Sequence, residues 1–172
     1  LHVVDHYRGD EMDETRNVLV ESARIARGQI KNLRELHVGD FDALIIPGGF
    51  GVAKNLSDFA ISGPLCSVQG DVLNATQSFA KAGKPVGLMC IAPALAAKIF
   101  GQGVQCTIGS DHETATALQQ MGALHVESTV EDIVVDQTHK LVTTPAYMLA
   151  GSISEAAAGI NKLVDRVLEM VG

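Results

Sequence analysis

The sequence has few aromatic residues, no tryptophan and only three cysteines. Its 172 residues include two Tyr and five Phe, so Ala, Val, Leu and Ile supply most of the 47% hydrophobic fraction. This composition suits strands buried on both faces better than an aromatic-rich β-sandwich. Cys66, Cys90 and Cys106 are odd in number and far apart. That pattern excludes a disulfide framework and predicts a reducing, cytoplasmic location.

The chain also lacks an excess of basic residues and any long apolar run. Thirteen Lys and Arg stand against 20 Asp and Glu, a net charge of −7. Without a basic stripe, nucleic acid is not an expected partner. No apolar run approaches the ~20 residues that span a bilayer, so a membrane is not expected either. The chain shows no repeat or linker, and residues 1–172 are predicted to form a single domain.

Short apolar runs alternate with amphipathic stretches along the chain. Strands are predicted at 43–46, 85–89 and 105–108, with a hairpin formed by 132–135 and 140–144. Helices are predicted at 14–27, 71–81, 92–100, 110–121 and from 152 to the C-terminal region. This alternation predicts an α/β fold with a mostly parallel sheet and helices on both faces. In such sheets ligands bind beyond the carboxyl ends of the strands.

Helix starts and ends are marked by several residues. Asp13 is the predicted N-cap of the first helix and Gly28 follows its end. Ser110 with Glu113, and Ser152 with Glu155, have the spacing of capping boxes. The last helix is predicted to bury one stripe, made of Ala156, Ile160, Leu163, Val167 and Met170.

Cys90 lies where the predicted strand 85–89 runs directly into a helix. A nucleophile on such a sharp turn projects from the edge of the sheet, and the start of the helix favours thiolate over thiol. The N–H of Ile91 would point to where an oxyanion develops. A small buried hydrophobe is the other interpretation of Cys90.

A second loop at the same edge is rich in glycine. Gly48, Gly49 and Gly51 follow the strand 43–46, and their N–H groups could supply the second arm of an oxyanion hole. A simple strand-ending turn explains the same glycines. Their spacing is not that of a dinucleotide-binding fingerprint, and no P-loop lysine follows.

The remaining candidate ligands and nucleophiles give weaker signals. His6, His37, His112, His125 and His139 lie in loops or at element edges, where solvated side chains are expected, and no pair has the helical spacing of metal ligands. Neither a metal nor an organic cofactor is predicted. Cys66 and Cys106 have no local activating group and are predicted to be structural.

Three motifs in this order resemble the ElbB-type proteins of the PfpI and Parkinsonism-associated deglycase superfamily, which is class I glutamine amidotransferase-like. They are residues 42–51 (DALIIPGGFG), 83–93 (GKPVGLMCIAP) and 142–148 (VTTPAYM), and the resemblance extends over the whole chain. It implies a flavodoxin-like three-layer sandwich, usually a homodimer. Cys90 would be the catalytic nucleophile, with an oxyanion hole from the N–H groups of Gly49 and Ile91.

ElbB-type proteins are described as glyoxalases that need no glutathione. The resemblance therefore implies a lyase (hydro-lyase) that converts a small dicarbonyl, glyoxal or methylglyoxal, to glycolate or lactate. Thiolate attack on the aldehyde would give a hemithioacetal, and proton transfer through an enediol with loss of the thiol would follow. Substrate contacts are expected from Gly48, Phe50, Thr144 and Pro145, although Thr144 is equally well explained as a strand terminus.

The sequence departs from the family pattern in two ways. Ile91 stands where hydrolytic relatives carry His, which disfavours a cysteine hydrolase or amidase with an acyl-enzyme. The acidic residue that relatives place against the cysteine belongs to a first βαβ segment that precedes anything matching Leu1. Glu14 is a poor substitute, because it is predicted in the first turn of a helix.

The absent segment leads to a further expectation about the sheet. Strands 43–46 and 85–89 would be left without a neighbour, and an uncovered apolar edge invites aggregation. The functional protein is therefore expected to be longer at its N-terminus. A non-catalytic role, in which Cys90 is a redox sensor or part of a partner-binding surface, remains the alternative to the glyoxalase.

Overall fold

The computed structural model describes residues 3–172, and the chain divides into two compact units. The first unit ends at Leu36, and the second runs from His37 to Gly172. All three motifs of the family resemblance lie in the second unit.

The first unit consists of short elements without a buried core. They are β1 (Val4–Asp5) and β2 (Asp10–Glu11), which pair antiparallel, the helix α1 (Val18–Ile25) and a 3₁₀ turn at Leu33–Glu35. No residue from 3 to 36 is buried. Even apolar side chains of α1 are largely exposed, Val20 by 60% and Ile25 by 89%. The hydrophobic core of the described chain therefore belongs to the second unit.

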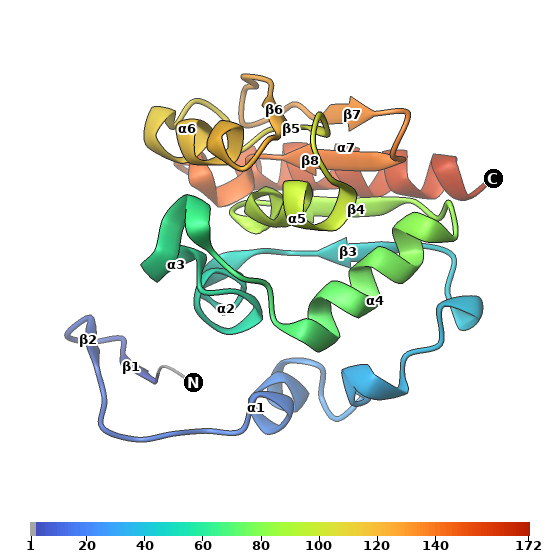
Figure 1. Ribbon diagram of the computed structural model, residues 1–172. Coiled ribbons are helices and arrows are strands. Elements are labelled where there is room, and N and C mark those ends of the chain that lie inside the picture. The colour runs from blue at the N-terminus through green and yellow to red at the C-terminus, as the bar shows by residue number, and fades with distance from the viewer. Residues whose placement is uncertain (1–2) are drawn as a thin grey trace. The chain divides into compact units, whose positions relative to one another are not determined.

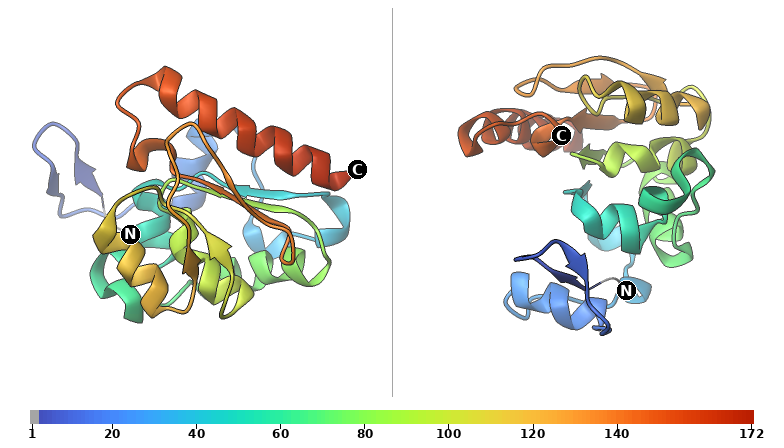
Figure 2. Two further views of the ribbon diagram at one scale, coloured as in Figure 1. Left: turned by 90° about the horizontal axis from the view of Figure 1, so that it is seen from above. Right: turned by 90° about the vertical axis from the view of Figure 1, so that its left-hand side faces the viewer.

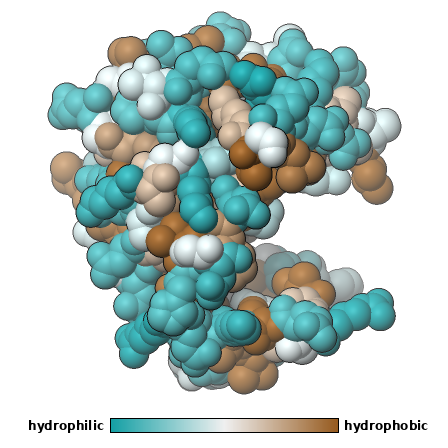
Figure 3. Space-filling view, turned by 90° about the vertical axis from the view of Figure 1, so that its right-hand side faces the viewer, coloured by the Kyte–Doolittle hydropathy of each residue, from teal (hydrophilic) through white to brown (hydrophobic). Residues whose placement is uncertain are grey.

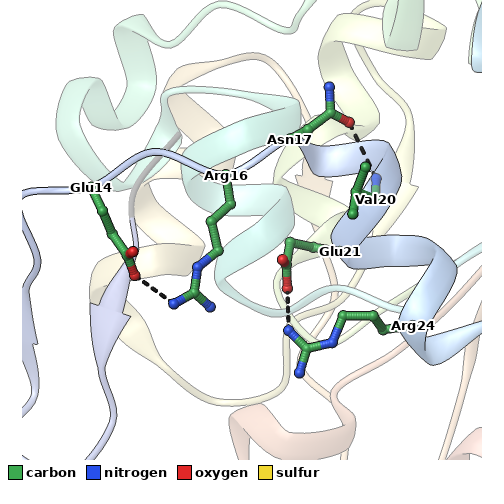
Figure 4. A network of polar contacts seen from close by, with 6 residues as sticks. All are labelled: Glu14, Arg16, Asn17, Val20, Glu21 and Arg24. Carbon is green, nitrogen blue, oxygen red and sulfur yellow. Dashed lines mark hydrogen bonds and ion pairs between the residues drawn. The ribbon is translucent and has the colours of Figure 1, made fainter.

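The helix α1 begins at Val18 and is capped by Asn17, so the predicted start at Glu14 after an Asp13 cap is wrong. The Oδ1 of Asn17 accepts hydrogen bonds from two first-turn amides at 3.0 and 3.2 Å, the longer from Val20 (Figure 4). Asn and Asp are comparable caps, and the extended backbone that a cap requires is found at Asn17.

Charged side chains pair with one another before and along this helix. Glu14 forms an ion pair with Arg16 before the cap. The carboxylate of Glu21 accepts a hydrogen bond from the guanidinium of Arg24 at 2.7 Å (Figure 4). Glu14 is thus outside the helix, not in its first turn. The helix ends at Ile25, two residues before the predicted end at Arg27. Gly28 lies in the turn that follows, with a φ of 81°, and its N donates to the carbonyl oxygen of Ala23 at 2.8 Å.

The second unit is built on a mixed four-stranded sheet. Its strands, in spatial order, are β3 (Leu44–Ile46), β4 (Val86–Met89), β8 (Leu141–Thr144) and β7 (Val134–Asp136). The first three are parallel, and β7 runs antiparallel to β8, which confirms the predicted hairpin. Every residue of β4 and β8 is buried, as their uncharged sequences indicate for strands covered on both faces.

A second, two-stranded parallel ladder joins β5 (Gln105–Cys106) to β6 (Leu124–His125). The predicted strand 105–108 is shorter than expected, because its last two amides bond to side chains. The N of Thr107 donates to the Oγ1 of Thr143 at 3.0 Å, and the N of Ile108 donates to the Nε2 of His125 at 3.4 Å.

Helices cover both faces of the sheet, as predicted (Figures 1 and 2). The helix α7 (Ile153–Val171) lies on one face, and α4 (Gly70–Lys81) and α5 (Ala96–Phe100) lie on the other. In the predicted stripe of α7, Ala156, Leu163 and Val167 are buried, and Ile160 and Met170 pack against the same core. Gly87 of β4 admits this helix, since a Cβ there would lie 2.8 Å from the Cδ2 of Leu163.

Two further helices begin at side-chain caps. The Oγ of Ser152 accepts from the N of Glu155 at 3.2 Å, which confirms Ser152 as the predicted cap; the Glu155 carboxylate accepts in turn from the N of Gly151 at 2.9 Å. The helix α6 (His112–Gln120) is instead capped by Asp111, whose Oδ1 accepts from the N of Thr114 at 2.7 Å. The prediction of Ser110 as cap is therefore wrong by one residue, because Asp111 has the extended backbone of a cap.

The rest of the second unit is made of short turns. They comprise α2 (Gly49–Gly51), a π-helical turn (Val52–Leu56), α3 (Phe59–Ser62) and 3₁₀ turns at Val38–Asp40, Gly63–Leu65, Ala92–Leu95 and Ala146–Met148. The predicted helix 92–100 is thus a 3₁₀ turn that continues into the short α5.

The edge of the sheet differs in part from expectation. The strand β4 has neighbours on both sides, β3 and β8, so the prediction that 85–89 lacks a neighbour is wrong. The strand β3 lies at one end of the sheet in the described chain.

The described surface combines polar residues with scattered apolar ones. On the face in Figure 3, hydrophobic residues form small groups between hydrophilic ones. Such scattered exposure is ordinary for folded proteins. No helix among residues 3–172 is both long and apolar enough to cross a membrane.

Candidate functional site

The carboxyl ends of the three parallel strands meet at one edge of the sheet (Figure 1, and facing the viewer in the right panel of Figure 2). The strands end at Ile46, Met89 and Thr144, and each is followed by one of the three motif loops. The fold therefore brings together, at the edge where such sheets bind ligands, the segments that the sequence analysis selected.

Cys90 is the first residue after β4 and has a left-handed backbone, with a φ of 59°. Its N donates a 3.1 Å hydrogen bond to the carbonyl oxygen of Thr144. The side chain is half-buried and packs against a core cluster that includes Met89 and Ala146. A non-glycine residue in this region is strained, and such strain is held in place by the surrounding structure. A side chain on such a sharp strand-to-helix turn projects from the edge of the sheet.

The glycine loop after β3 lies directly against this turn. Gly48 has a φ of 89°, and a Cβ on it would lie 2.6 Å from the carbonyl oxygen of Met89 and 2.8 Å from the Cβ of Cys90. No side chain fits there. The side of Gly48 on which a side chain would project is therefore occupied by residues 89–91. Gly49, with a φ of 77°, faces open space.

The two amides expected to form an oxyanion hole begin short turns. Gly49 opens α2, and Ile91 caps the 3₁₀ turn Ala92–Leu95. The N of Ile91 would lie 3.3 Å from a Cβ on Gly48, which places it beside the glycine loop. First-turn N–H groups have no partner within their own turn. Both turns are short. The partial positive charge at their starts therefore comes from individual N–H groups and not from the dipole of a long helix.

The other residues expected at the substrate differ in exposure. Phe50 is 78% exposed, and the Nζ of Lys54 lies 5.7 Å from its ring centroid. Thr144 and Pro145 are buried. The Thr144 hydroxyl donates to the carbonyl oxygen of Asp132 at 2.8 Å, so Thr144 reaches Cys90 through its backbone carbonyl rather than its side chain.

The other two thiols are buried, in line with the structural role predicted for them. Desolvation raises the pKa of the Cys66 thiol, whose Sγ contacts the Sδ of Met121 at 3.8 Å. The pKa of the Cys106 thiol is raised to about 12. Desolvation is the larger cause, and the negative charge of the nearby Asp136 carboxylate is the smaller one. Neither thiol is a ready nucleophile at neutral pH.

A buried carboxylate was missed by the sequence analysis. Asp136 is 5% exposed, and its Oδ2 accepts from the N of Gln105 and contacts the Nδ1 of His139, both at 2.8 Å. Burial acts to raise the Asp136 pKa, but these hydrogen bonds outweigh it and the pKa lies below its usual value. The sequence could have indicated this pair, because Asp136 and His139 are the first and last residues of the predicted hairpin turn.

His125 also departs from the solvated state that was expected. It accepts a hydrogen bond from the N of Ile108, and desolvation lowers its pKa. Within residues 3–172 no group of three His, Cys, Asp or Glu side chains is arranged to hold a metal ion.

A flavodoxin-like α/β sheet with a half-exposed cysteine in a strained strand-to-helix turn defines the class of protein. The model of the DJ-1/PfpI family matches residues 22–150, and the chain belongs to this family. A crystal structure of an isoprenoid biosynthesis protein with an amidotransferase-like domain from Ehrlichia chaffeensis matches with a TM-score of 0.91 and 34% identity. That match covers 99% of this chain and 78% of the other.

Curated relatives agree with this assignment. The human glutamine amidotransferase-like class 1 domain-containing protein 3, mitochondrial, is 46% identical over 182 residues, which cover all of this chain and 68% of the human protein. The zebrafish (Danio rerio) ES1 protein, mitochondrial, is 32% identical over 165 residues, 86% of this chain and 61% of that protein. Because these relatives are named as mitochondrial, the predicted cytoplasmic location is wrong.

Proposed function

We propose that this protein is a glyoxalase of the ElbB type, a cysteine-dependent lyase that converts glyoxal or methylglyoxal to a hydroxy acid without glutathione. The observation that carries the proposal is the position of Cys90, half-exposed in a left-handed turn against Gly48 and Gly49. The chain's other thiols are buried. Membership of the DJ-1/PfpI family, whose members include glyoxalase-like and deglycase-like enzymes, supports the proposal.

The proposed reaction uses water and no external oxidant. The Cys90 thiolate adds to one aldehyde carbon, and the new alkoxide takes a proton to give a hemithioacetal. Loss of the proton on that carbon gives an enediol, and protonation at the neighbouring carbon leaves a thioester. The neighbouring carbonyl is thereby reduced as the thiol-bearing carbon is oxidised. Water then cleaves the carbon–sulfur bond, releasing glycolate or lactate and the thiol.

The residues around Cys90 take simple roles in this scheme. The N–H groups of Gly49 and Ile91 stabilise the alkoxide of the hemithioacetal. Phe50 and Pro145 are proposed to border the substrate. No carboxylate is assigned to the proton transfers, because the candidate Glu14 pairs with Arg16 in the first unit.

One observation favours a second candidate function. A half-exposed cysteine in a sharp strand-to-helix turn is also suited to reversible oxidation to a sulfenic acid. Turnover separates the two functions, since an enzyme forms many products per chain and a sensor is modified once.

Location and assembly are also proposed. The names of the human and zebrafish relatives support a mitochondrial location. A homodimer is proposed from the family resemblance.

The test is an assay with glyoxal and methylglyoxal in the absence of glutathione. Loss of dicarbonyl and formation of hydroxy acid are followed for the wild type, for Cys90→Ser and for Cys66→Ala, which changes a buried thiol instead. The proposal predicts activity in the wild type and Cys66→Ala and none in Cys90→Ser. An active Cys90→Ser variant would refute the assignment of the nucleophile.

A further inference from the structure

Thr144 connects Cys90 to the segment 130–132 through two hydrogen bonds. Its carbonyl oxygen accepts from the N of Cys90 at 3.1 Å, and its hydroxyl donates to the carbonyl oxygen of Asp132 at 2.8 Å. The residue is fully buried. Both of its polar groups are therefore used inside the protein, one of them on the reactive turn itself.

The helix α7 closes this arrangement from the other side. A Cβ on Gly159 would lie 2.7 Å from the Oγ1 of Thr144 and 2.3 Å from the carbonyl oxygen of Val130. Only glycine lets the helix approach so closely. The end of β8 is thus held between α7 and the segment 130–132.

From these contacts we propose that Thr144 is a positioning residue for Cys90. The hydroxyl fixes the end of β8, and the carbonyl of the same residue then fixes the Cys90 amide and its left-handed backbone. A strained backbone persists only where neighbouring groups over-determine it. The inference rests on the proposed function in taking Cys90 as the reactive thiol.

Thr143 supplies a matched comparison in the same strand. It is also fully buried, but its Oγ1 accepts from the N of Thr107 at 3.0 Å, towards β5 and away from Cys90. Successive residues of a strand point to opposite faces. Removing either hydroxyl disturbs a buried hydrogen bond, but only the Thr144 hydroxyl belongs to the connection to Cys90.

The experiment measures the rate at which iodoacetamide alkylates Cys90 at pH 7, by mass spectrometry of the Cys90 peptide. Thr144→Val should alkylate roughly fivefold more slowly, the factor expected for one ordinary hydrogen bond, because the Cys90 backbone is no longer held in place. Thr144→Ser keeps the hydroxyl and should restore the wild-type rate. Thr143→Val should retain that rate.

In Gly159→Ala the new methyl group on α7 would collide with the Thr144 hydroxyl. This substitution provides a second variant if Thr144→Val does not fold, as judged by circular dichroism. It should slow alkylation in the same direction. A folded Thr144→Val with the wild-type alkylation rate would overturn the proposal, as would an equal change in Thr143→Val. Because alkylation needs no dicarbonyl turnover, these results stand apart from success or failure of the glyoxalase assay.

Discussion

Gly48 and Cys90, 42 residues apart in the chain, lie against each other at the edge of the sheet: a Cβ on Gly48 would lie 2.8 Å from the Cβ of Cys90. The same atom would lie 2.6 Å from the carbonyl oxygen of Met89. The absence of a side chain at Gly48 therefore allows the turn after β4 to lie where it does. This contact explains why a glycine-rich loop and a cysteine from different motifs form one site.

Gly48→Ala should displace the Cys90 turn. The new methyl group would collide with backbone, and the φ of 89° is unfavourable for alanine. A misplacement of this kind is expected to lower kcat/KM for methylglyoxal by roughly tenfold to a hundredfold. Gly51→Ala is the control, since Gly51 has an ordinary φ of −57° and open space around its Cβ position. Equal losses in both variants would show that the contact does not matter.

Thiol labelling of the native protein should stop at one cysteine. Cys90 is partly exposed, whereas Cys66 and Cys106 are each exposed by 2% or less and their thiol pKa values are raised. Ellman's reagent should therefore release one equivalent at pH 7 from native protein and three after unfolding. The Cys90→Ser variant should release none before unfolding. Rapid labelling of Cys106 in the native state would contradict the burial described above.

Stability should depend on Asp136 in acid. Because its pKa is lowered in the folded state, the ionised carboxylate stabilises the fold above the unfolded carboxyl value near 3.8. This stabilisation should be lost as the pH falls through the folded pKa. Asp136→Asn should lower the free energy of unfolding at pH 7 by about 1–3 kcal/mol and weaken its fall in acid.

Urea denaturation between pH 2 and 7 measures this effect, with Asp165→Asn on the exposed face of α7 as the control. If Asp136→Asn kept the full acid dependence of the wild type, the hydrogen bonds to Gln105 and His139 could not be its source.

The packing of α7 on the sheet should account for much of the stability of the second unit. Leu163 is fully buried against β4, and Leu163→Ala is expected to lower the free energy of unfolding by about 2–5 kcal/mol. Leu168 lies on the same helix but is 61% exposed. Its replacement by alanine should change stability by no more than ~0.5 kcal/mol. Thermal or urea unfolding compares them, and similar losses would argue against the described orientation of the helix.

The fold could be predicted largely from the sequence because its strongest signals are local. Uncharged apolar runs ending in Gly or Cys mark β3 and β4, and the Ser152–Glu155 capping box marks α7. The start of α1 was misplaced because Asp13 and Asn17 are both suitable caps, and only the backbone distinguishes them.

The details of the site could not be predicted in the same way. The register of the whole sheet determines which face of β8 the Thr144 side chain occupies. The hydrogen bond from its hydroxyl to Asp132 could therefore not be predicted. The partnership of Asp136 with Gln105 requires β5 to lie beside the hairpin, which is a tertiary arrangement. Local patterns identified the strand-to-helix turn at Cys90, and long-range packing determines how that turn is held.

The central claim is that Cys90 turns over small dicarbonyls, and counting product per chain tests it most directly. Wild-type protein would be mixed with a large excess of methylglyoxal without glutathione, and lactate would be quantified by NMR beside Cys90→Ser. The account predicts many equivalents of lactate per chain from the wild type and none above background from the variant. A single equivalent of adduct without lactate, or equal lactate from both proteins, would contradict it.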